Sequence, residues 1–292
     1  MKTIATHNHS FHADDVFGVA TLLLIYPDAK VIRTRDEGLI AQADIVLDVG
    51  RIYDESKLRF DHHQEGGAGV RENGIPYASF GLIWKRFGKE LCVSQEEIDN
   101  IDTNLVQVVD AEDNGFTLFT PVIASARLFS ISSVIGCLNP VLSEKQDFDL
   151  IFMQAVEIAK TILCREIVVA KELVETKRVF RETYKKSSDK RFVILEKEYS
   201  RSLWGQCVEE FPELLFVVVP REQMFALRAV RKNASTFENR KDLPLTWAGK
   251  VGKELEEITG VVGANFCHNK RFVANAKTKE AILALLDKAL NE

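Results

Sequence analysis

The sequence predicts an α/β protein with an N-terminal domain built on a parallel sheet and a smaller C-terminal α/β domain. Three observations lead to this prediction. Near the N-terminus, short apolar segments alternate with helical patterns, as in an open parallel sheet covered by helices. A long helical pattern over residues 143–185 then interrupts the alternation. Beyond it, strand and helix signals resume and continue to the C-terminus.

The predicted parallel sheet begins with strands at 2–6, 30–34 and 44–49. The stretch 15–26 between the first two strands is predicted to be a mostly buried helix, and Pro27 ends it. In sheets of this kind, ligands bind at the carboxyl ends of the strands. Residues that follow these strands directly are therefore candidates for a shared site.

Two further helices are predicted in the first domain. An apolar stripe indicates one helix at 78–90, and a capping box at Ser94 opens another. The second helix is expected to end at Gly115. Its apolar face should contain Ile98, Ile101, Leu105, Val108 and Val109.

The long helical pattern becomes strongly charged in its second half, which is typical of a connector between two domains. We therefore expect a metal-binding domain at 1–143, a helical connector at 144–190 and a substrate-binding domain at 191–292. The last domain should contain strands at 192–195, 214–220 and 224–230, and helices at 248–259 and 278–290.

Composition limits the class of protein. The chain of 292 residues is 46% hydrophobic and 28% charged, as is ordinary for a globular protein. The net charge of −5 argues against binding nucleic acid through bulk electrostatics, although it permits a local basic groove. The five cysteines are dispersed and form no Cys-x-x-Cys pair, which indicates free thiols in a reducing compartment. We see no signal peptide and no apolar stretch long enough to span a membrane, so we expect a cytoplasmic protein.

Five of the six histidines lie in two short stretches, 7–12 and 62–63. Imidazole and carboxylate ligands without thiolates suit divalent ions such as Mn²⁺, Mg²⁺, Zn²⁺ or Co²⁺. Several carboxylates also adjoin apolar strand or helix ends, where an unpaired charge would be costly and a bound cation would remove that cost. A two-metal site of this kind activates water against phosphate esters. The pattern predicts a two-metal phosphoesterase.

Asp48 is the candidate for a bridging ligand, because it ends a buried strand. Asp110 and Asp113 stand three residues apart on one helix face, so spacing does not choose between them. Asp15 is interpreted as a helix-start charge, and Asp61 as a group that orients a neighbouring histidine. The candidate metal ligands are His7, His12, Asp14, Asp48, His62, Asp110 and Asp113.

Candidate substrate contacts lie in both domains. In the first, they are His9, for which metal ligation is the alternative, and Asn114, for which a plain helix end is the alternative. In the second, Gly263 precedes a polar cluster for which a solvated hairpin is the alternative. That cluster contains His268, Lys270 and Arg271, and the strand candidate before it supplies Arg228 and Arg231 as weaker phosphate contacts.

Over most of its length the chain resembles the DHH phosphoesterase superfamily and, within it, the Myg-type family. The resemblance rests on these motifs: Thr6-His7-Asn8-x-x-Phe11-His12-x-Asp14, Asp48-Val49-Gly50-x-x-Tyr53-Asp54, Arg59-Phe60-Asp61-His62-His63-Gln64, Asp110-Ala111-x-Asp113-Asn114-Gly115 and Trp247-Ala248-Gly249. It implies a manganese-preferring two-metal core and a second domain that binds the substrate. It also implies that His63 contacts the phosphate or the transition state, and that a loop like 263–271 holds the substrate phosphate.

The chain departs from the family pattern in its first motif. His12 stands where the superfamily has its first Asp, after a one-residue insertion. His9, Ala13 and Asp15 replace the Gly, Cys and Glu that are usual in the Myg-type family. These changes leave open the ligand count at one metal and the role of His9.

The leading hypothesis is a manganese-dependent phosphodiesterase acting on RNA or short oligonucleotides, and the resemblance favours a 3′-to-5′ exonuclease. One alternative is a hydrolase of a small phosphorylated nucleotide or cyclic dinucleotide. Another is a non-catalytic metal-bound binding module, which the His12 replacement would support. Protein hydrolysis has little support, because the sequence has no His-Glu-x-x-His motif. The sequence does not fix the oligomeric state, and a homodimer is one candidate.

Overall fold

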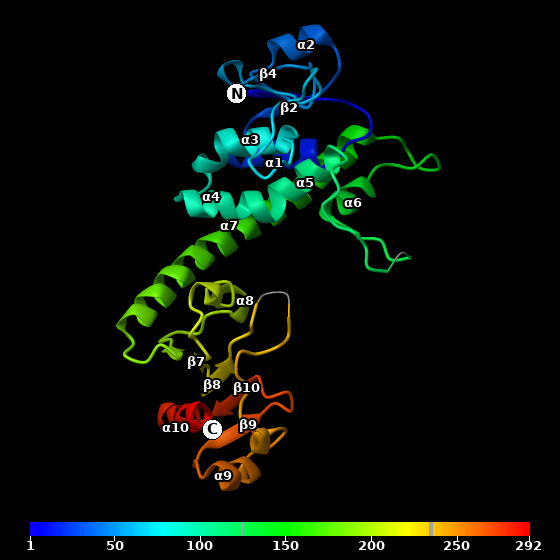
Figure 1. The fold of residues 1–292 in the computed structure, drawn as a ribbon. Helices are drawn as coiled ribbons and strands as arrows, with labels where there is room; N and C mark the ends of the chain where they lie inside the picture. Colours follow the sequence, from blue (N-terminus) through cyan, green and yellow to red (C-terminus); the bar gives the residue numbers. More distant parts are fainter. Residues whose placement is uncertain (124, 234–235) are drawn as a thin grey trace. The chain divides into compact units, whose positions relative to one another are not determined.

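The computed structural model describes residues 1–123, 125–233 and 236–292. The chain forms two compact units, Met1–Lys171 and Glu172–Glu292, and each contains a five-stranded sheet (Figure 1). The predicted α/β class is thus confirmed. Helix α7, Phe148–Lys186, is continuous and contributes to both units, so the division falls inside the segment expected to be a connector.

The sheet of the first unit has the strand order β2-β1-β3-β5-β4. Its strands are β1 Thr3–Thr6, β2 Lys30–Arg33, β3 Ile45–Leu47, β4 Tyr53–Asp54 and β5 Arg59–Phe60. All neighbours are parallel except β4 and β5, which are antiparallel. Because β1, β3 and β5 are adjacent and parallel, the residues that follow them meet at one edge.

Helix α1, Ala13–Ile25, packs closely on this sheet. A Cβ on Gly18 would lie 2.4 Å from Leu47 Cδ1 of β3, so only glycine allows this approach. The remaining helices of the unit are α2 Glu37–Gln42, α3 Ser79–Phe87, α4 Gln95–Ile101, α5 Gln107–Asp113 and α6 Ile131–Gly136. The aromatic side chains of Phe17, Phe60, Phe80 and Trp84 are fully buried between these layers.

The helix predicted from Ser94 to Gly115 is interrupted. A π-helical turn, Asp102–Val106, separates α4 from α5, and the Gln107 amide donates to the Asp102 carbonyl five residues back. The extra residue shifts the apolar face, so Val106 is buried and Val108 is only half-buried. Leu105 and Val109 are buried as predicted, so beyond Ile101 only Val108 differs from the predicted apolar face. π-helical turns are frequent at functional sites, and this one directly precedes α5.

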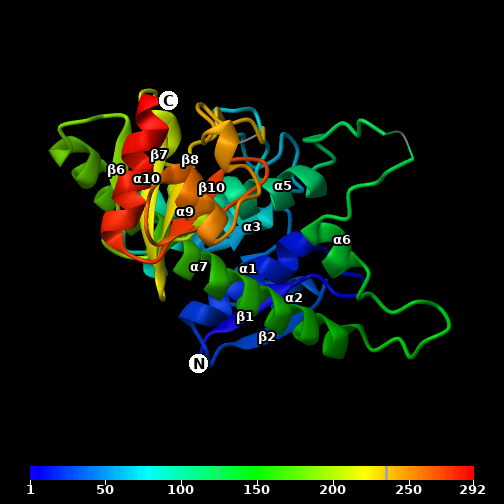
Figure 2. The same ribbon diagram turned by 90° about the horizontal axis from the view of Figure 1, so that it is seen from below.

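The sheet of the second unit has the order β6-β7-β8-β10-β9 and is antiparallel except between β6 and β7. Its strands are β6 Phe192–Ile194, β7 Phe216–Arg221, β8 Met224–Ala229, β9 Ala264–Cys267 and β10 Val273–Ala276. Along β7 the side chains alternate between two cores. Phe216 and Val218 join the core under α10, Lys279–Asn291, whereas Val217 and Val219 join the core that contains Trp204. Figure 2 shows α10 against the sheet, where it contacts β8.

Two short helices complete this unit: α8 Arg201–Trp204 and α9 Lys253–Thr259. The helix expected at 248–259 starts only at Lys253, because Gly249 and Gly252 adopt positive φ angles that break a helix. In the described part of the chain, no helix combines the length and the apolar character that crossing a membrane would require.

Candidate metal centre

Histidines and carboxylates of the first unit gather at the edge where β1, β3 and β5 end. His7 follows β1, Asp48 follows β3, and Asp61 and His62 follow β5. The start of α1 adds His12, Asp14 and Asp15 from the side, and the end of α5 adds Asp113. Parallel strand order thus brings together residues that are up to 106 positions apart, as the interval from His7 to Asp113 shows.

Asp48 lies at the centre, and its two oxygens face different groups. Oδ2 lies 3.2 Å from His7 Nε2, whereas Oδ1 lies 3.3 Å from His62 Nε2 and 3.5 Å from His63 Nδ1. The hydroxyl of Ser79, the first residue of α3, also donates to Oδ1 at 3.1 Å. A carboxylate with its oxygens directed to opposite sides has the geometry required of a bridging ligand.

The tautomer of His7 points to a cation. Its Nδ1 lies 3.0 Å from the carbonyl oxygen of Asn8 and must carry a proton, because a carbonyl only accepts. In the neutral ring, the lone pair of Nε2 then faces carboxylate oxygens of Asp15 and Asp48, each 3.2 Å away. Lone pair and carboxylates repel one another unless a proton or a metal ion stands between them. The residues present therefore fit a divalent ion.

A second convergence surrounds His62. Its Nε2 lies 3.2 Å from Asp113 Oδ2 and 3.9 Å from Asp14 Oδ2, in addition to Asp48. Both carboxylate oxygens of Asp14 are buried, and neither accepts a hydrogen bond from any described residue. An unpaired carboxylate is costly to bury. A cation among these groups would remove that cost.

The protonation equilibria reflect the crowding of negative charge. Burial, then the charge of Asp48, raises the pKa of Asp14 well above its usual value, and burial raises the pKa of Asp15 to about 7. Burial also raises the pKa of Asp113. Burial opposes ionisation of Asp48 as well, but its bonds with His62 and His7 prevail and lower its pKa. Bound divalent ions would favour the ionised form of all four carboxylates.

Three sets of side chains bring ligand atoms within 4.8 Å of one another: His7, His12 and Asp48; Asp48, His62 and His63; and His12, Asp14 and Asp113. Asp48 and His12 each belong to two sets. The donors are imidazole nitrogens and carboxylate oxygens only, which suit Mn²⁺, Zn²⁺ or Co²⁺, while an all-oxygen set would be more typical of Mg²⁺. The chain therefore contains a candidate metal cluster, and its chemistry does not name one ion.

Asp61 is outside the three ligand sets and holds His63, which belongs to one of them. Its Oδ1 accepts hydrogen bonds from the backbone amide of His63 at 2.9 Å and from His63 Nδ1 at 2.8 Å. Its Oδ2 accepts from the Arg51 amide at 2.6 Å. The bond to Asp61 is the main cause of the raised pKa of His63, whose side chain is 55% exposed. His63 is thus oriented by Asp61 and remains partly exposed to solvent.

The two candidates on α5 are separated by the fold. Asp113 reaches His62, whereas Asp110 lies outside the three sets of ligand atoms found among the described residues. Asp110 instead accepts from the Gly81 amide at 2.9 Å and pairs with Arg71 Nη2 at 2.8 Å. Burial still raises the pKa of Asp110 to about 7, against the pull of Arg71. Asp110 therefore joins α5 to α3 beneath the cluster.

Two residues of the cluster were not assigned to it from the sequence. Asp15 accepts from the backbone amide of His12 as a helix-start carboxylate should, yet its other oxygen faces His7. Its signal is the almost wholly apolar helix that follows it, since such a helix buries its first turn too. Ser79, which contacts Asp48, carries no recognisable signal.

The loop after β1 is fixed by two contacts distant in sequence. Asn139 accepts from the amide of Phe11 at 2.9 Å and donates to its carbonyl at 2.9 Å. Arg33 donates to the carbonyl of His9 at 2.6 Å. The His9 ring lies edge-on to Phe148, 6.2 Å between centroids, and takes no part in the three ligand sets described above.

Asn114, the other substrate-contact candidate of the first unit, lies at the end of α5. Its side chain donates to the Asp110 carbonyl at 2.8 Å, which is a helix-end contact.

The candidates in the second unit lie on a hairpin and a strand. His268, Lys270 and Arg271 occupy the turn between β9 and β10. His268 Nδ1 accepts from the amide of Lys270 at 3.1 Å, and Arg271 pairs with Asp242 at 2.7 Å. Arg228 lies in β8 and is partly buried, and burial and Arg221 lower its pKa to about 10. The hairpin expected as the alternative is present, and its role in substrate binding stays a prediction.

Comparison with known proteins extends over the whole chain. The family model MYG1_exonuc, described as an uncharacterised protein family (UPF0160), matches residues 3–290. A "MYG1 protein" from Dictyostelium discoideum is 30% identical over 320 residues, which cover 99% of this chain and 97% of that protein. A "MYG1 protein" from Chlamydia pneumoniae is 31% identical and covers 96% and 93%. A "MYG1 exonuclease" from Homo sapiens is 28% identical and covers 97% and 84%.

Proposed function

The chain belongs to the MYG1_exonuc family, and from this premise we propose that it is a divalent-metal-dependent phosphodiesterase. Within that class, we propose a 3′-to-5′ exonuclease acting on RNA or short oligonucleotides. The names of the human and mouse relatives support a nuclease. The observation that carries the proposal is Asp48, whose two oxygens face His7 on one side and His62 on the other. The proposal includes the DHH-type two-metal arrangement, for which Mn²⁺ is the expected ion.

Asp48 would be shared by two ions. On one side, His7 and Asp15 would complete the ligand set, since His7 Nε2 lies 3.2 Å from both Asp48 Oδ2 and Asp15 Oδ2. His12 is available beside them. Asp14, His62 and Asp113 would complete the other side. When bound, such ions generate a nucleophile from water at neutral pH and stabilise charge on the oxygens of a phosphodiester. Asp110 is not included, because Arg71 and Gly81 already engage it.

His63 is the residue proposed to contact the phosphate. Its Nδ1–H is donated to Asp61, so Nε2 is the nitrogen left for the substrate. A proton at Nε2 would donate a hydrogen bond to a phosphate oxygen as charge develops there. Asp61 fixes the ring through two bonds and keeps Nε2 in one position. Removal of a single donor of this kind costs about 10²–10³ in kcat.

The test uses protein stripped with a chelator and then supplied with Mn²⁺, Mg²⁺, Zn²⁺ or Co²⁺. Single-stranded RNA labelled at its 5′ end should shorten progressively from the 3′ end, whereas RNA with a blocked 3′ end should persist. Asp48→Asn should be inactive, and Asp28→Asn, a matched change at an exposed turn of the same unit, should retain full activity. No cleavage of RNA with any of the four ions would refute the exonuclease proposal.

The same assay decides between the remaining functions. Turnover of cyclic dinucleotides or small phosphorylated nucleotides in place of RNA would favour a small-molecule hydrolase. Stoichiometric metal binding without turnover of any phosphodiester would favour a non-catalytic binding module. The buried and converging carboxylates argue for catalysis, since a structural ion needs no shared ligand between two sites.

A further inference from the structure

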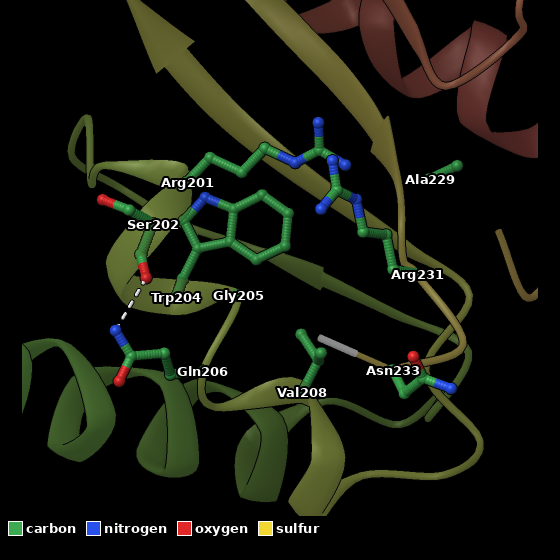
Figure 3. A pocket seen from close by; sticks show the side chains of 9 residues that line it. All are labelled: Arg201, Ser202, Trp204, Gly205, Gln206, Val208, Ala229, Arg231 and Asn233. Carbon is green, nitrogen blue, oxygen red and sulfur yellow. Dashed lines mark hydrogen bonds between the residues drawn. The ribbon is translucent and has the colours of Figure 1, made fainter. Parts of the chain in front are cut away.

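A cavity of about 350 Å³ lies in the second unit, between α8 and the segment that follows β8 (Figure 3). Arg201 is the first residue of α8, and Arg231 stands two residues beyond the end of β8. Figure 3 shows the two arginine side chains reaching toward one another across the cavity. The wall also contains Trp204 and Val208. The cavity belongs wholly to the second unit and contains none of the candidate metal ligands.

The arginines of this cavity contact aromatic rings and no carboxylate. The Arg201 guanidinium lies over the ring of Phe272 at 5.5 Å, and that of Arg231 lies over Phe237 at 4.4 Å. Neither forms an ion pair within the described ranges of the chain, although Arg178, Arg181 and Arg191 of the same unit all do. Two facing guanidiniums without a counter-ion indicate a place prepared for an anion.

Neighbouring charge sharpens this indication. Burial and the charge of Arg231 lower the pKa of Arg201. Burial, Arg221 and Arg201 lower the pKa of Arg228 in β8. Gathered cations repel one another and destabilise the free protein, and a bound anion would relieve that repulsion.

Trp204 forms an apolar part of the cavity wall. Its side chain is 2% exposed, and its indole N–H is buried away from solvent and has no acceptor among the described residues. The guanidinium groups of Arg201 and Arg231 are therefore the charged donors at this cavity.

We propose that this cavity binds a phosphate group of a nucleotide unit in a nucleic-acid strand. Guanidinium groups match phosphate oxygens with paired N–H donors, and two of them line this cavity. The cavity is larger than a bare phosphate needs, and aromatic rings continue from it: Phe272 lies under Arg201, and His268 lies 4.3 Å from Phe272 between centroids. Bases stack on such rings without regard to sequence.

This inference rests on the proposed function for the identity of the strand, because an exonuclease must hold RNA beyond the bond it cleaves. The phosphate chemistry itself has two sources, a strand or a free nucleotide. The cations of this site are Arg201 and Arg231. Arg271 in the turn 268–271 is not one of them, since it is already paired with Asp242.

The test measures binding of a short fluorescent single-stranded RNA to the full chain in the presence of a chelator, so that no cleavage occurs. Arg201→Gln with Arg231→Gln should weaken binding more than about tenfold, or roughly 1.4 kcal/mol. Each single variant should reduce the slope of log affinity against log salt by about one. Arg178→Gln, with the same change in charge, should bind like the wild type.

A double variant that binds RNA like the wild type would overturn the proposal. If that variant does not fold, the wild type still decides: AMP and inorganic phosphate should each raise its melting temperature above that in chloride at equal ionic strength, and no rise with either refutes the site. A larger rise with AMP than with phosphate supports a nucleotide unit. The proposed function fails separately, when the wild type binds RNA through these arginines but Mn²⁺ gives no cleavage.

Discussion

Gly81→Ala should disturb the candidate metal centre indirectly, because Gly81 contacts Asp110 and Arg71 and none of the proposed metal ligands. A Cβ at Gly81 would lie 1.8 Å from Asp110 Oδ2 and 2.8 Å from Arg71 Nη2. The Asp110 side chain is fully buried, so it cannot turn aside into solvent. The substitution must therefore move α3 away from α5 or break the bond between the Gly81 amide and Asp110.

The expected cost follows from these contacts. Overpacking a core costs about 1–3 kcal/mol, and loss of a buried hydrogen bond adds about 1 kcal/mol. We take about 3 kcal/mol in total, which for a unit the size of Met1–Lys171 lowers the melting temperature by roughly 6–12 °C. Because Asp113 stands one helical turn beyond Asp110, metal affinity should fall as well.

Calorimetry of the metal-free protein measures the first effect, and metal titration measures the second. Gly136→Ala is the matched control, since a Cβ there meets nothing within 4 Å and the residue lies in helix α6. The control should melt within about 4 °C of the wild type, because an open helical site gains at most about 1 kcal/mol. A Gly81→Ala protein that melts and binds metal like the wild type would refute the role assigned to the contact between α3 and α5.

Three further substitutions test the cluster itself. Asp48→Ala should abolish activity and cut metal content at both positions, and elemental analysis with a full complement would contradict the bridging role. His62→Ala should lose one ion, whereas His63→Ala should keep both and lose turnover, and equal metal content in the two variants would show that the roles are wrong. Asp14→Asn should raise the melting temperature of the metal-free protein, because a buried unpaired carboxylate is removed, yet it should abolish the further rise that Mn²⁺ gives the wild type. Thermal scans with and without Mn²⁺ check this last expectation, which a lower metal-free melting temperature would contradict.

Sequence reasoning could bring His7 and Asp48 together because each directly follows a predicted apolar strand, and parallel strands end at the same edge of a sheet. His62 comes after β5, a strand of two residues that the sequence did not predict. Asp110 and Asp113 could not be separated in this way. Their roles depend on a π-helical turn that shifts the helix face, and on a glycine of α3 that lets Asp110 approach Arg71. Neither feature has a local sequence signal.

The cavity of the second unit was even less accessible from sequence. Arg201 and Trp204 belong to a helix of four residues, and Arg231 follows a strand that begins more than twenty positions later. No motif joins them, and the net charge of the chain gives no hint of a local basic site. Only packing of α8 against the end of β8 brings the cations and the buried indole into one cavity.

Asp48 combines an unfavourable backbone conformation with a side-chain position that suits a metal ligand. It adopts a positive φ of 55°, a conformation that aspartate tolerates better than most residues but that remains unfavourable. Its amide still donates to the Phe60 carbonyl at 3.2 Å, so the strand pairing continues while the side chain leaves the alternation of β3. That departure lets one carboxylate face both His7 and His62. Strained backbone and unpaired buried carboxylates lie within one cluster, and a bound cation relieves only the second of these costs. Metal binding and folding of the first unit should therefore be coupled, with affinity for the ion appearing directly as added stability.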